Sequence, residues 1–288
     1  MLPLKKVYST MNPSPEHANK PPSVPVVQRA DWDGAFKGQR PTNAEVILKV
    51  ALQKSSSGGS GAFLGLADDG QRYWIKPLNN AQGERVPITE QIVGRMGNFL
   101  GAPTCEIRTI FISEEFAGWE FRPSRKLETG IAHASLHVEN AIFTRALDHC
   151  MDDDNSRRYA FLFALYDWCW GGDAQGLLAV KDENRFFSHD HGWYLPPEGK
   201  TWTVADLDAN VDVPHELSTQ PNGIGASAAE EVARVLEGVT KNVLQDALAA
   251  IPSAWPVTDE ELEWAGFFFE KRASMVAERV RQRFRRAS

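Results

Sequence analysis

The sequence has few cysteines, no long apolar run and little excess of either charge, and each shortage excludes a class of protein. Its 3 cysteines, Cys105, Cys150 and Cys169, are too few and too scattered for a disulfide framework or a paired cysteine metal site. No apolar stretch approaches the roughly 20 residues that span a bilayer, and the start of the chain lacks the apolar core of a secretory signal. We therefore expect a cytoplasmic protein without a membrane span.

The net charge of −7 is small for a chain of 288 residues, and it argues against general nucleic-acid binding. The charge is unevenly distributed, because residues 271–288 contain seven basic side chains and a single acid. The arginines spread around a predicted helix, so we expect this basic end to complement its own helix dipole or the acidic body of the protein. The alternative is that it docks an acidic partner or RNA.

Hydrophobic periodicity predicts two unlike lobes behind a proline-rich arm. The arm covers residues 1–30, a β-rich lobe covers residues 31–125 and a mainly helical lobe covers residues 126–288. Because strands come first and helices follow, the expected fold class is α+β. In the β-rich lobe we predict an antiparallel meander, a helix and a further strand, with 114–130 connecting the lobes. The strands are expected at 45–53, 62–67, 71–77 and 105–113, and the helix runs from a cap at Thr89 to Leu100.

The helical lobe contains a segment at 157–170 that is apolar nearly all round, which indicates a buried helix ending at Gly171 and Gly172. A hairpin of two short strands follows, and then a loop-rich stretch and two long helices. The strands are expected at 177–180 and 185–188, the loop at 198–225, and the helices at 226–251 and 259–286.

A short glycine-rich loop between the first two predicted strands is a candidate for binding phosphate: Gly58, Gly59, Ser60 and Gly61. Glycines at such a place let backbone N–H groups approach phosphate oxygens closely. The spacing fits neither the dinucleotide-binding G-x-G-x-x-G pattern nor the P-loop, and a plain hairpin tip is the simpler interpretation. The position of the loop, ahead of a strand with one lysine, is what favours a nucleotide site.

Lys76 is that lysine, and it shares a strand face with Trp74. A lysine at a strand end usually extends to solvent, but it could hold nucleotide phosphates if an acid held it in turn. Glu90, on the following predicted helix, is the candidate acid. The simpler interpretation of Glu90 is a first-turn acid that is favoured by the helix dipole.

Two aspartates flank the predicted hairpin of the helical lobe. Asp173 follows Gly171 and Gly172 on a loop, and Asp190 lies between His189 and His191 after the second strand. Two such carboxylates suit phosphoryl transfer, because one can accept the proton of an attacking hydroxyl while the other holds Mg²⁺. Each aspartate could instead cap a turn or loop.

Taken in order, these motifs resemble the HipA-like branch of the protein-kinase-like fold. The similar segments are YWIKPLNN at 73–80, TEQIVGRMGNFLGAP at 89–103, the stretch 167–173, and Asp-His-Gly at 190–192 before Trp193. The resemblance implies a bilobal kinase that binds ATP between its lobes and transfers the γ-phosphate, with Mg²⁺, to Ser or Thr of a protein. By the same resemblance Lys76 contacts the phosphates, Glu90 pairs with Lys76, Asp173 is the catalytic base and Asp190 binds the metal.

The segment after Asp173 departs from the family pattern, which has Asp-Arg-x-x-x-Asn-Leu-Leu with the Asn as a second metal ligand. Here Ala174 stands for the Arg, and either Gly176 or Leu178 stands for the Asn. Gln175 is the remaining side chain that could reach the metal. A catalytically impaired pseudokinase that binds nucleotide and acts as an interaction module is therefore the alternative function.

Four histidines offer a different chemistry. His133 and His137 stand four residues apart, and His189 and His191 flank Asp190. Zinc accepts neutral imidazoles together with a carboxylate, but H-x-x-x-H without the glutamate of H-E-x-x-H is a weak motif. A zinc site is therefore a minor alternative to the kinase chemistry.

Overall fold

The computed structural model describes residues 27–55, 59, 61–172, 174–197, 199–219 and 223–285. The arm up to residue 26, Gly58, Ser60, Asp173 and Arg286 lie outside the described residues. Within the described ranges, no helix combines the length and the apolar character that crossing a membrane requires.

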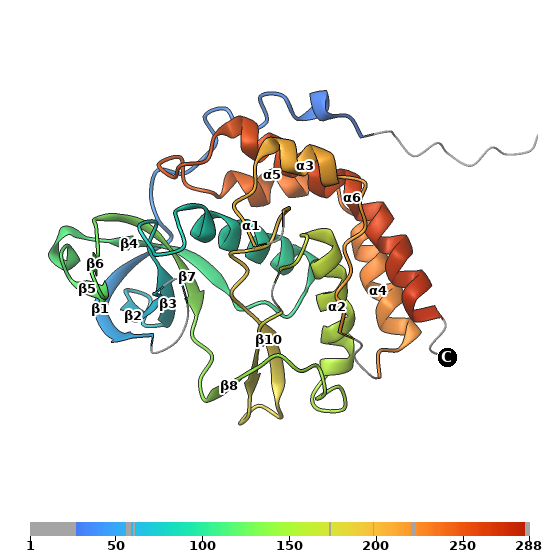
Figure 1. The fold of residues 1–288 in the computed structure, drawn as a ribbon, viewed down its shortest axis with the longest axis horizontal. Coiled ribbons are helices and arrows are strands. Elements are labelled where there is room, and N and C mark those ends of the chain that lie inside the picture. Colours follow the sequence, from blue (N-terminus) through green and yellow to red (C-terminus); the bar gives the residue numbers. More distant parts are fainter. Residues whose placement is uncertain are drawn as a thin grey trace, which may run out of the picture.

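The N-terminal lobe is a closed barrel (Figure 1) of β1 (Val46–Lys54), β2 (Phe63–Ala67), β3 (Arg72–Lys76), β4 (Ile107–Ile112) and β7 (Gly130–Leu136). Its order is β1-β2-β3-β7-β4, with antiparallel pairing of β1, β2 and β3, which confirms the predicted meander. Parallel pairing of Val46 with Ile110 closes the barrel between β1 and β4. On β3, Tyr73 and Ile75 fill the barrel core, so Lys76 takes the other face.

The helix α1 (Arg85–Leu100) packs against β4 and β7 and begins before the predicted cap at Thr89. Pro87 in its first turn is tolerated there, because the first N–H groups of a helix have no intrahelical partner to lose. Thr89 caps nothing, since its hydroxyl donates to the carbonyl of Arg85. Glu90 consequently lies in the second turn, buried, and not in the first turn as predicted.

The segment 114–130, predicted to connect the lobes, belongs to the β-rich lobe. It forms η2 (Glu114–Phe116), the hairpin of β5 (Glu120–Arg122) and β6 (Arg125–Lys126), and the first residue of β7. Because β7 pairs with both β3 and β4, the barrel continues to Leu136, and the boundary drawn at residue 125 falls inside β6.

The C-terminal lobe packs helices beside a small sheet (Figure 1). The helices are α2 (Asn155–Trp168), α3 (Val204–Asn210), α4 (Ala226–Glu237), α5 (Lys241–Ala249) and α6 (Asp259–Arg285), and the sheet order is β10 (Arg185–Ser188), β9 (Gly176–Ala179), β8 (Ala141–Thr144). The predicted hairpin is β9–β10. Three predictions are corrected: the helix expected at 226–251 breaks after Gly238 into α4 and α5, α3 lies in the expected loop, and β8 adds a third strand.

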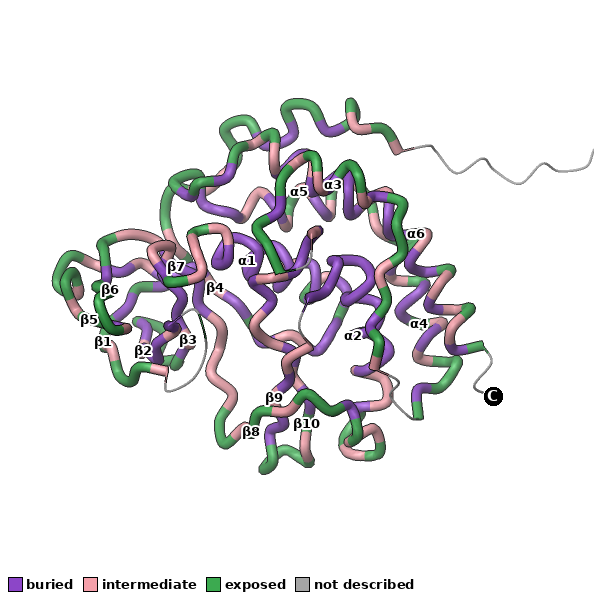
Figure 2. Tube along the Cα trace, viewed as in Figure 1, coloured by how far each residue is buried: buried purple, intermediate pink, exposed green. Residues whose placement is uncertain are grey.

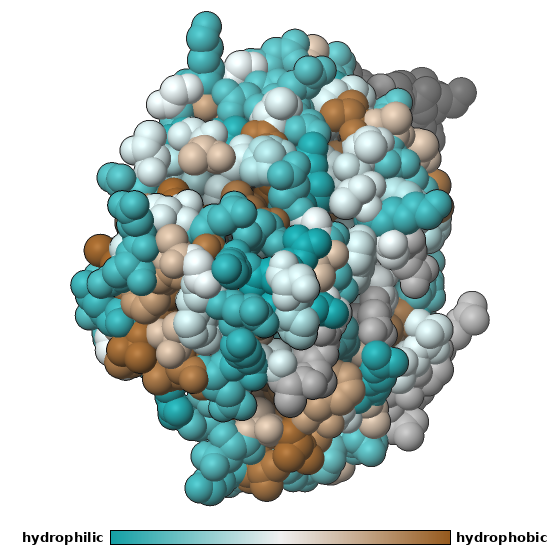
Figure 3. Space-filling model, turned by 60° about the vertical axis from the view of Figure 1, so that its left-hand side comes forward, coloured by the Kyte–Doolittle hydropathy of each residue, from teal (hydrophilic) through white to brown (hydrophobic). Residues whose placement is uncertain are grey.

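The core of this lobe surrounds α2, which is buried nearly all round (Figure 2). The short helix η1 (Arg29–Trp32), ahead of the barrel, packs on α6, with Trp32 fully buried. Figure 3 shows one face of the molecule, which is mostly hydrophilic with separate apolar patches. The exposed large apolar side chains include Val50 and Leu52 on β1 and Ile142 and Phe143 on β8.

The basic end of the chain lies against acids of the same chain. Arg281 pairs with Glu230 and Glu237 of α4, and Arg283 pairs with Glu216. The predicted complement of basic end and acidic body is confirmed for these side chains, which leaves their charges already neutralised within the chain.

Candidate active site

Lys76 stands at the junction of the two lobes, held between two acids. Its Nζ donates to Glu90 of α1 and to Oδ1 of Asp190, the latter at 2.5 Å. Lys76 is 8% exposed and Glu90 3% exposed, whereas the side chain of Asp190 is 28% exposed. These three residues, named here the lysine cluster, bring together one positive and two negative charges.

The lysine cluster fixes its own charge states. Burial alone would lower the pKa of Lys76, but attraction by Glu90 and Asp190 outweighs burial and raises it. Burial alone would raise the pKa of Asp190, yet the nearby charge of Lys76 holds it well below its usual range. At neutral pH the ammonium and the Asp190 carboxylate are therefore both ionised, as phosphate and metal binding require.

The turn after β10 places Asp190 in this cluster. Asp190 has a φ of 60°, a left-handed conformation that is uncommon outside glycine and concentrates at functional sites. The N–H of His191 donates to Oε2 of Glu90, and the ring Nε2 of His191 lies 2.9 Å from Oγ of Ser188. Burial lowers the pKa of His191 to about 4, although Glu90 opposes this effect. The His191 ring is therefore neutral, and the backbone N–H of His191 supports Glu90.

The glycine-rich loop joins β1 to β2 at the edge of the barrel. Gly59 accepts a hydrogen bond from Arg122 of β5 at its carbonyl oxygen, and Gly61 has a φ of 74°. Gly58 and Ser60 lie outside the described residues. The proposed contact of this loop with phosphate therefore stays a prediction.

A sharp turn follows α2 and precedes residue 173; we call residues Trp170–Gly172 the glycine turn. Trp170 has a φ of 53°. A Cβ at Gly171 would lie 2.5 Å from the ring of Tyr166, and one at Gly172 would lie 2.7 Å from the carbonyl oxygen of Trp193. The close approach of these neighbours explains the two glycines, because any side chain there would force the turn apart.

Neither residue that could replace the missing metal-binding asparagine is suited to the task. A Cβ at Gly176 would lie 2.3 Å from Cε2 of Phe186, so β9 and β10 leave no space for a side chain at that position. Leu178 is apolar and buried in the core. The structure thus supports the departure seen in the sequence and leaves Gln175 as the remaining polar side chain of this segment.

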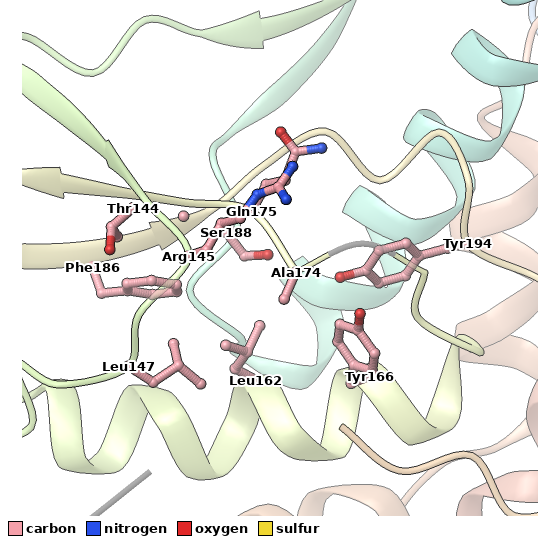
Figure 4. Close-up of a pocket in the computed structure, with 11 residues that line it drawn as sticks. Thr144, Arg145, Leu147, Leu162, Tyr166, Ala174, Gln175, Phe186, Ser188 and Tyr194 are labelled. Atoms are coloured by element: carbon pink, nitrogen blue, oxygen red, sulfur yellow. The ribbon is translucent and has the colours of Figure 1, made fainter. Parts of the chain in front are cut away.

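Gln175 lies at a small depression between α2 and the β8–β9–β10 sheet. The space is about 240 Å³ including its open mouth, and its polar lining includes Thr144, Arg145, Tyr166 and Tyr194. Figure 4 shows Gln175 and Arg145 among the side chains that line this depression, while the two tyrosine hydroxyls point toward one another. Arg145 could not be proposed from the sequence, because it follows β8, a strand that was not predicted.

The histidines that were considered as zinc ligands have other hydrogen-bond partners. His133 and His137 lie on or just after β7: Nδ1 of His133 is 3.1 Å from Nε2 of Gln91, and Nδ1 of His137 accepts from Trp74. Burial lowers the pKa of His133 well below its usual value. Among the residues that the structure describes, no three His, Cys, Asp or Glu side chains are grouped as a metal site. The alternative zinc chemistry finds no support in this geometry.

The chain is similar to known proteins in sequence and in fold. Residues 47–173 match the family model described as HipA-like kinase. No curated protein sequence matches the chain. A Helicobacter pylori proinflammatory kinase, CtkA, is similar in structure, with a TM-score of 0.52 and 11% identity over 86% of this chain and 97% of that one.

The Golgi casein kinase is also similar, with a TM-score of 0.45 and 8% identity over 90% of this chain and 77% of that one. Its structure with Mn/ADP bound gives a TM-score of 0.44 and 9% identity over 89% of this chain and 77% of that one.

These findings confirm the predicted fold and the resemblance. The fold is α+β, bilobal and protein-kinase-like, as the likeness to the Helicobacter pylori kinase shows. The resemblance to HipA-like kinases is confirmed over 47–173, a range that contains Lys76 and Glu90 and ends at Asp173.

Proposed function

We propose that this chain, whose residues 47–173 match the HipA-like kinase family model, transfers the γ-phosphate of ATP to a hydroxyl group. The observation that carries the proposal is the lysine cluster, in which Glu90 and Asp190 hold Lys76 at the junction of the lobes. Such a lysine can bind nucleotide phosphates, and its acid partner keeps it in place. The predicted acceptor is Ser or Thr of a protein, which rests on the family resemblance.

The cluster is suited to Mg²⁺ and to phosphate at once. Asp190 keeps more than a quarter of its side chain exposed, so its carboxylate can receive a cation while Lys76 faces the phosphates. Carboxylate and amide oxygens are ligands that Mg²⁺ accepts, and Asp190 and Gln175 are the residues that would hold it. The metal would neutralise charge on the phosphates, and the glycine-rich loop would direct backbone N–H groups at them.

Asp173 is the proposed catalytic base. It is the next residue in the sequence after Gly171 and Gly172, which lie in a tight turn packed closely against Tyr166 and Trp193. In the reaction it would accept the proton of the attacking hydroxyl as the bond from oxygen to the γ-phosphorus forms and the bond to ADP breaks.

The test is transfer of labelled γ-phosphate by the full chain to a panel of proteins and to itself. We expect incorporation by the wild type and a loss of at least about 100-fold in Asp173→Ala and in Asp190→Asn. Asp182→Asn is the matched control, because Asp182 lies in the exposed β9–β10 turn. Equal incorporation by wild type and Asp173→Ala would refute the proposed base.

The second candidate function is a pseudokinase, and one observation favours it: neither Gly176 nor Leu178 supplies a second metal ligand. Binding of ATP with no transfer to any acceptor would establish this function. In that case the chain acts as a nucleotide-dependent interaction module.

A further inference from the structure

A buried group of charges lies directly beneath the glycine turn. Asp167, in the last turn of α2, meets Arg272 and Arg279 of α6, and we call these three residues the arginine cluster. Oδ1 of Asp167 accepts from Nη2 of Arg272 at 2.9 Å and from Nη2 of Arg279 at 2.7 Å, while Oδ2 accepts from Nε of Arg279 at 2.6 Å. Both carboxylate oxygens are therefore occupied by charge-assisted hydrogen bonds.

Arg272 ties the cluster to the turn itself. Its side chain is fully buried, and burial lowers its pKa to about 10 although Asp167 opposes this effect. Nη2 also donates to the carbonyl of Asp167 at 2.5 Å, and Nη1 donates to that of Val213 at 2.6 Å. The guanidinium lies over the ring of Trp170, 5.2 Å from its centre. A single buried cation thus contacts the end of α2, the first residue of the turn and the segment after α3.

The segment after α3 also contacts the glycine turn, through His215. The His215 ring stacks on Trp170, with centres 4.6 Å apart, and lies parallel to the ring of Tyr166. Its Nε2 is 2.5 Å from the carbonyl oxygen of Gly171, and its backbone N–H donates to Oδ1 of Asp167. The contacts of Arg272 and His215 therefore converge on Trp170 and Gly171.

The turn needs such outside support. Gly171 and Gly172 carry no side chains with which to anchor themselves, and glycine loses more conformational freedom on ordering than any other residue. We propose that Asp167, Arg272, Arg279 and His215 are positioning residues that hold the glycine turn in the conformation that phosphoryl transfer requires. The catalytic part of this proposal rests on the proposed function, whereas the holding of the turn does not.

Arg279 is the member to test, because its side chain is 19% exposed and its removal leaves Asp167 still paired with Arg272. Arg281→Gln is a matched control: Arg281 lies two residues away on the same helix and also makes paired hydrogen bonds to carboxylates, those of Glu230 and Glu237. The two variants lose the same kind of group from the same helix. They differ in whether the partner supports the glycine turn.

The experiment measures kcat, KM for ATP and amide hydrogen exchange in the full chain for wild type, Arg279→Gln, Arg279→Lys and Arg281→Gln. In Arg279→Gln we expect kcat to fall about tenfold or more, since small displacements of a reacting group are costly, with KM changed less than about twofold. The amides of Trp170 and Gly171 should exchange faster. Arg279→Lys, which keeps the charge without the paired geometry, should restore kcat only in part, and Arg281→Gln should match the wild type.

Equal losses in Arg279→Gln and Arg281→Gln, or unchanged exchange at Trp170 and Gly171 in Arg279→Gln, would overturn the proposal. Full restoration by Arg279→Lys would also overturn it, because charge alone would then suffice. If the wild type transfers no phosphate, the proposed function fails on its own test. The exchange of the turn amides still decides whether the arginine cluster holds the turn.

Discussion

The lysine cluster and the arginine cluster are both buried groups of three charges, but their excess charges differ in sign and in destination. The lysine cluster combines one ammonium with two carboxylates, and the side chain of Asp190 remains 28% exposed. The arginine cluster combines two guanidinium groups with one carboxylate, and Nη1 and Nη2 of Arg272 also donate to backbone carbonyls. A cluster whose excess charge is satisfied by the backbone is a structural tie, whereas one whose excess charge faces solvent can receive a ligand.

The strongest way to test this contrast is the same substitution at both sites. Asp167→Asn should lower the free energy of unfolding by about 3 kcal/mol or more, because it leaves the buried Arg272 without its counter-charge. Asp190→Asn should lower it by about half as much or less, because the Asp190 side chain is partly exposed and Lys76 keeps Glu90 as a partner. Urea denaturation at neutral pH measures both values. Equal losses at the two sites would show that the clusters do not differ in this way.

A double-mutant cycle sharpens the description of the lysine cluster. Lys76→Met leaves two carboxylates facing each other and should be strongly destabilising, whereas Lys76→Met combined with Glu90→Gln removes part of that repulsion. We expect the double variant to be more stable than the sum of the single effects by about 2 kcal/mol. Simple additivity in urea denaturation would mean that Lys76 and Glu90 are not energetically coupled. The description of Lys76, Glu90 and Asp190 as one cluster would then be wrong.

Gly176 is one of the two positions that correspond to the metal-binding asparagine of the family. The structure predicts that Gly176→Asn does not add a metal ligand to the lysine cluster. The new Cβ would overlap Phe186, so stability should fall by about 1 to 3 kcal/mol through overpacking. Phosphate transfer should not increase. Thermal unfolding and the transfer assay check the two statements, and a stable variant with a lower Mg²⁺ requirement would contradict them.

The smallest expected effect concerns pH. His191 follows Asp190 of the lysine cluster, and its ring is neutral because burial lowers its pKa to about 4. The unfolded chain, with an ordinary histidine pKa of about 6.5, binds this proton first, so stability falls as the pH falls. Between pH 7.5 and 5.5 the loss from this group is about 1.3 kcal/mol.

Urea denaturation of wild type and His191→Asn at the two pH values measures this contribution. The variant should lose less stability than the wild type on acidification. An identical loss in both proteins would show that His191 is not the group responsible.

The sequence alone was sufficient to predict the strands and helices that have a clear pattern of apolar residues. Alternation on β3 placed Tyr73 and Ile75 inside the barrel, and the apolar run of α2 predicted a buried helix. Weak local signals were missed: β8 gains its strand character from pairing with β9, and α3 lies in a polar, loop-like stretch. The break after Gly238 had a signal, since a glycine followed by Thr240 is a common end and start of helices.

The two clusters also differ in whether the sequence alone could predict them. The residues of the lysine cluster could be proposed from the order of motifs, and the structure brings Lys76, Glu90 and Asp190 together, while their roles in catalysis stay predictions. The arginine cluster could not be proposed, because nothing in the pattern of a basic helix says which arginine meets a buried carboxylate more than a hundred residues away. Only the packing of α6 against α2 decides that Arg279 turns inward and Arg281 outward to α4.

The separation between Asp167 and its arginines also sets an order of events during synthesis. Arg272 and Arg279 follow Asp167 by 105 and 112 residues, an interval of about 5 to 20 seconds at ordinary rates of translation. Throughout that interval α2 and the barrel strands have been made, while the carboxylate of Asp167 has neither counter-ion. The arginine cluster is therefore completed only after α6 has been made, so the support that it is proposed to give the glycine turn comes late in synthesis.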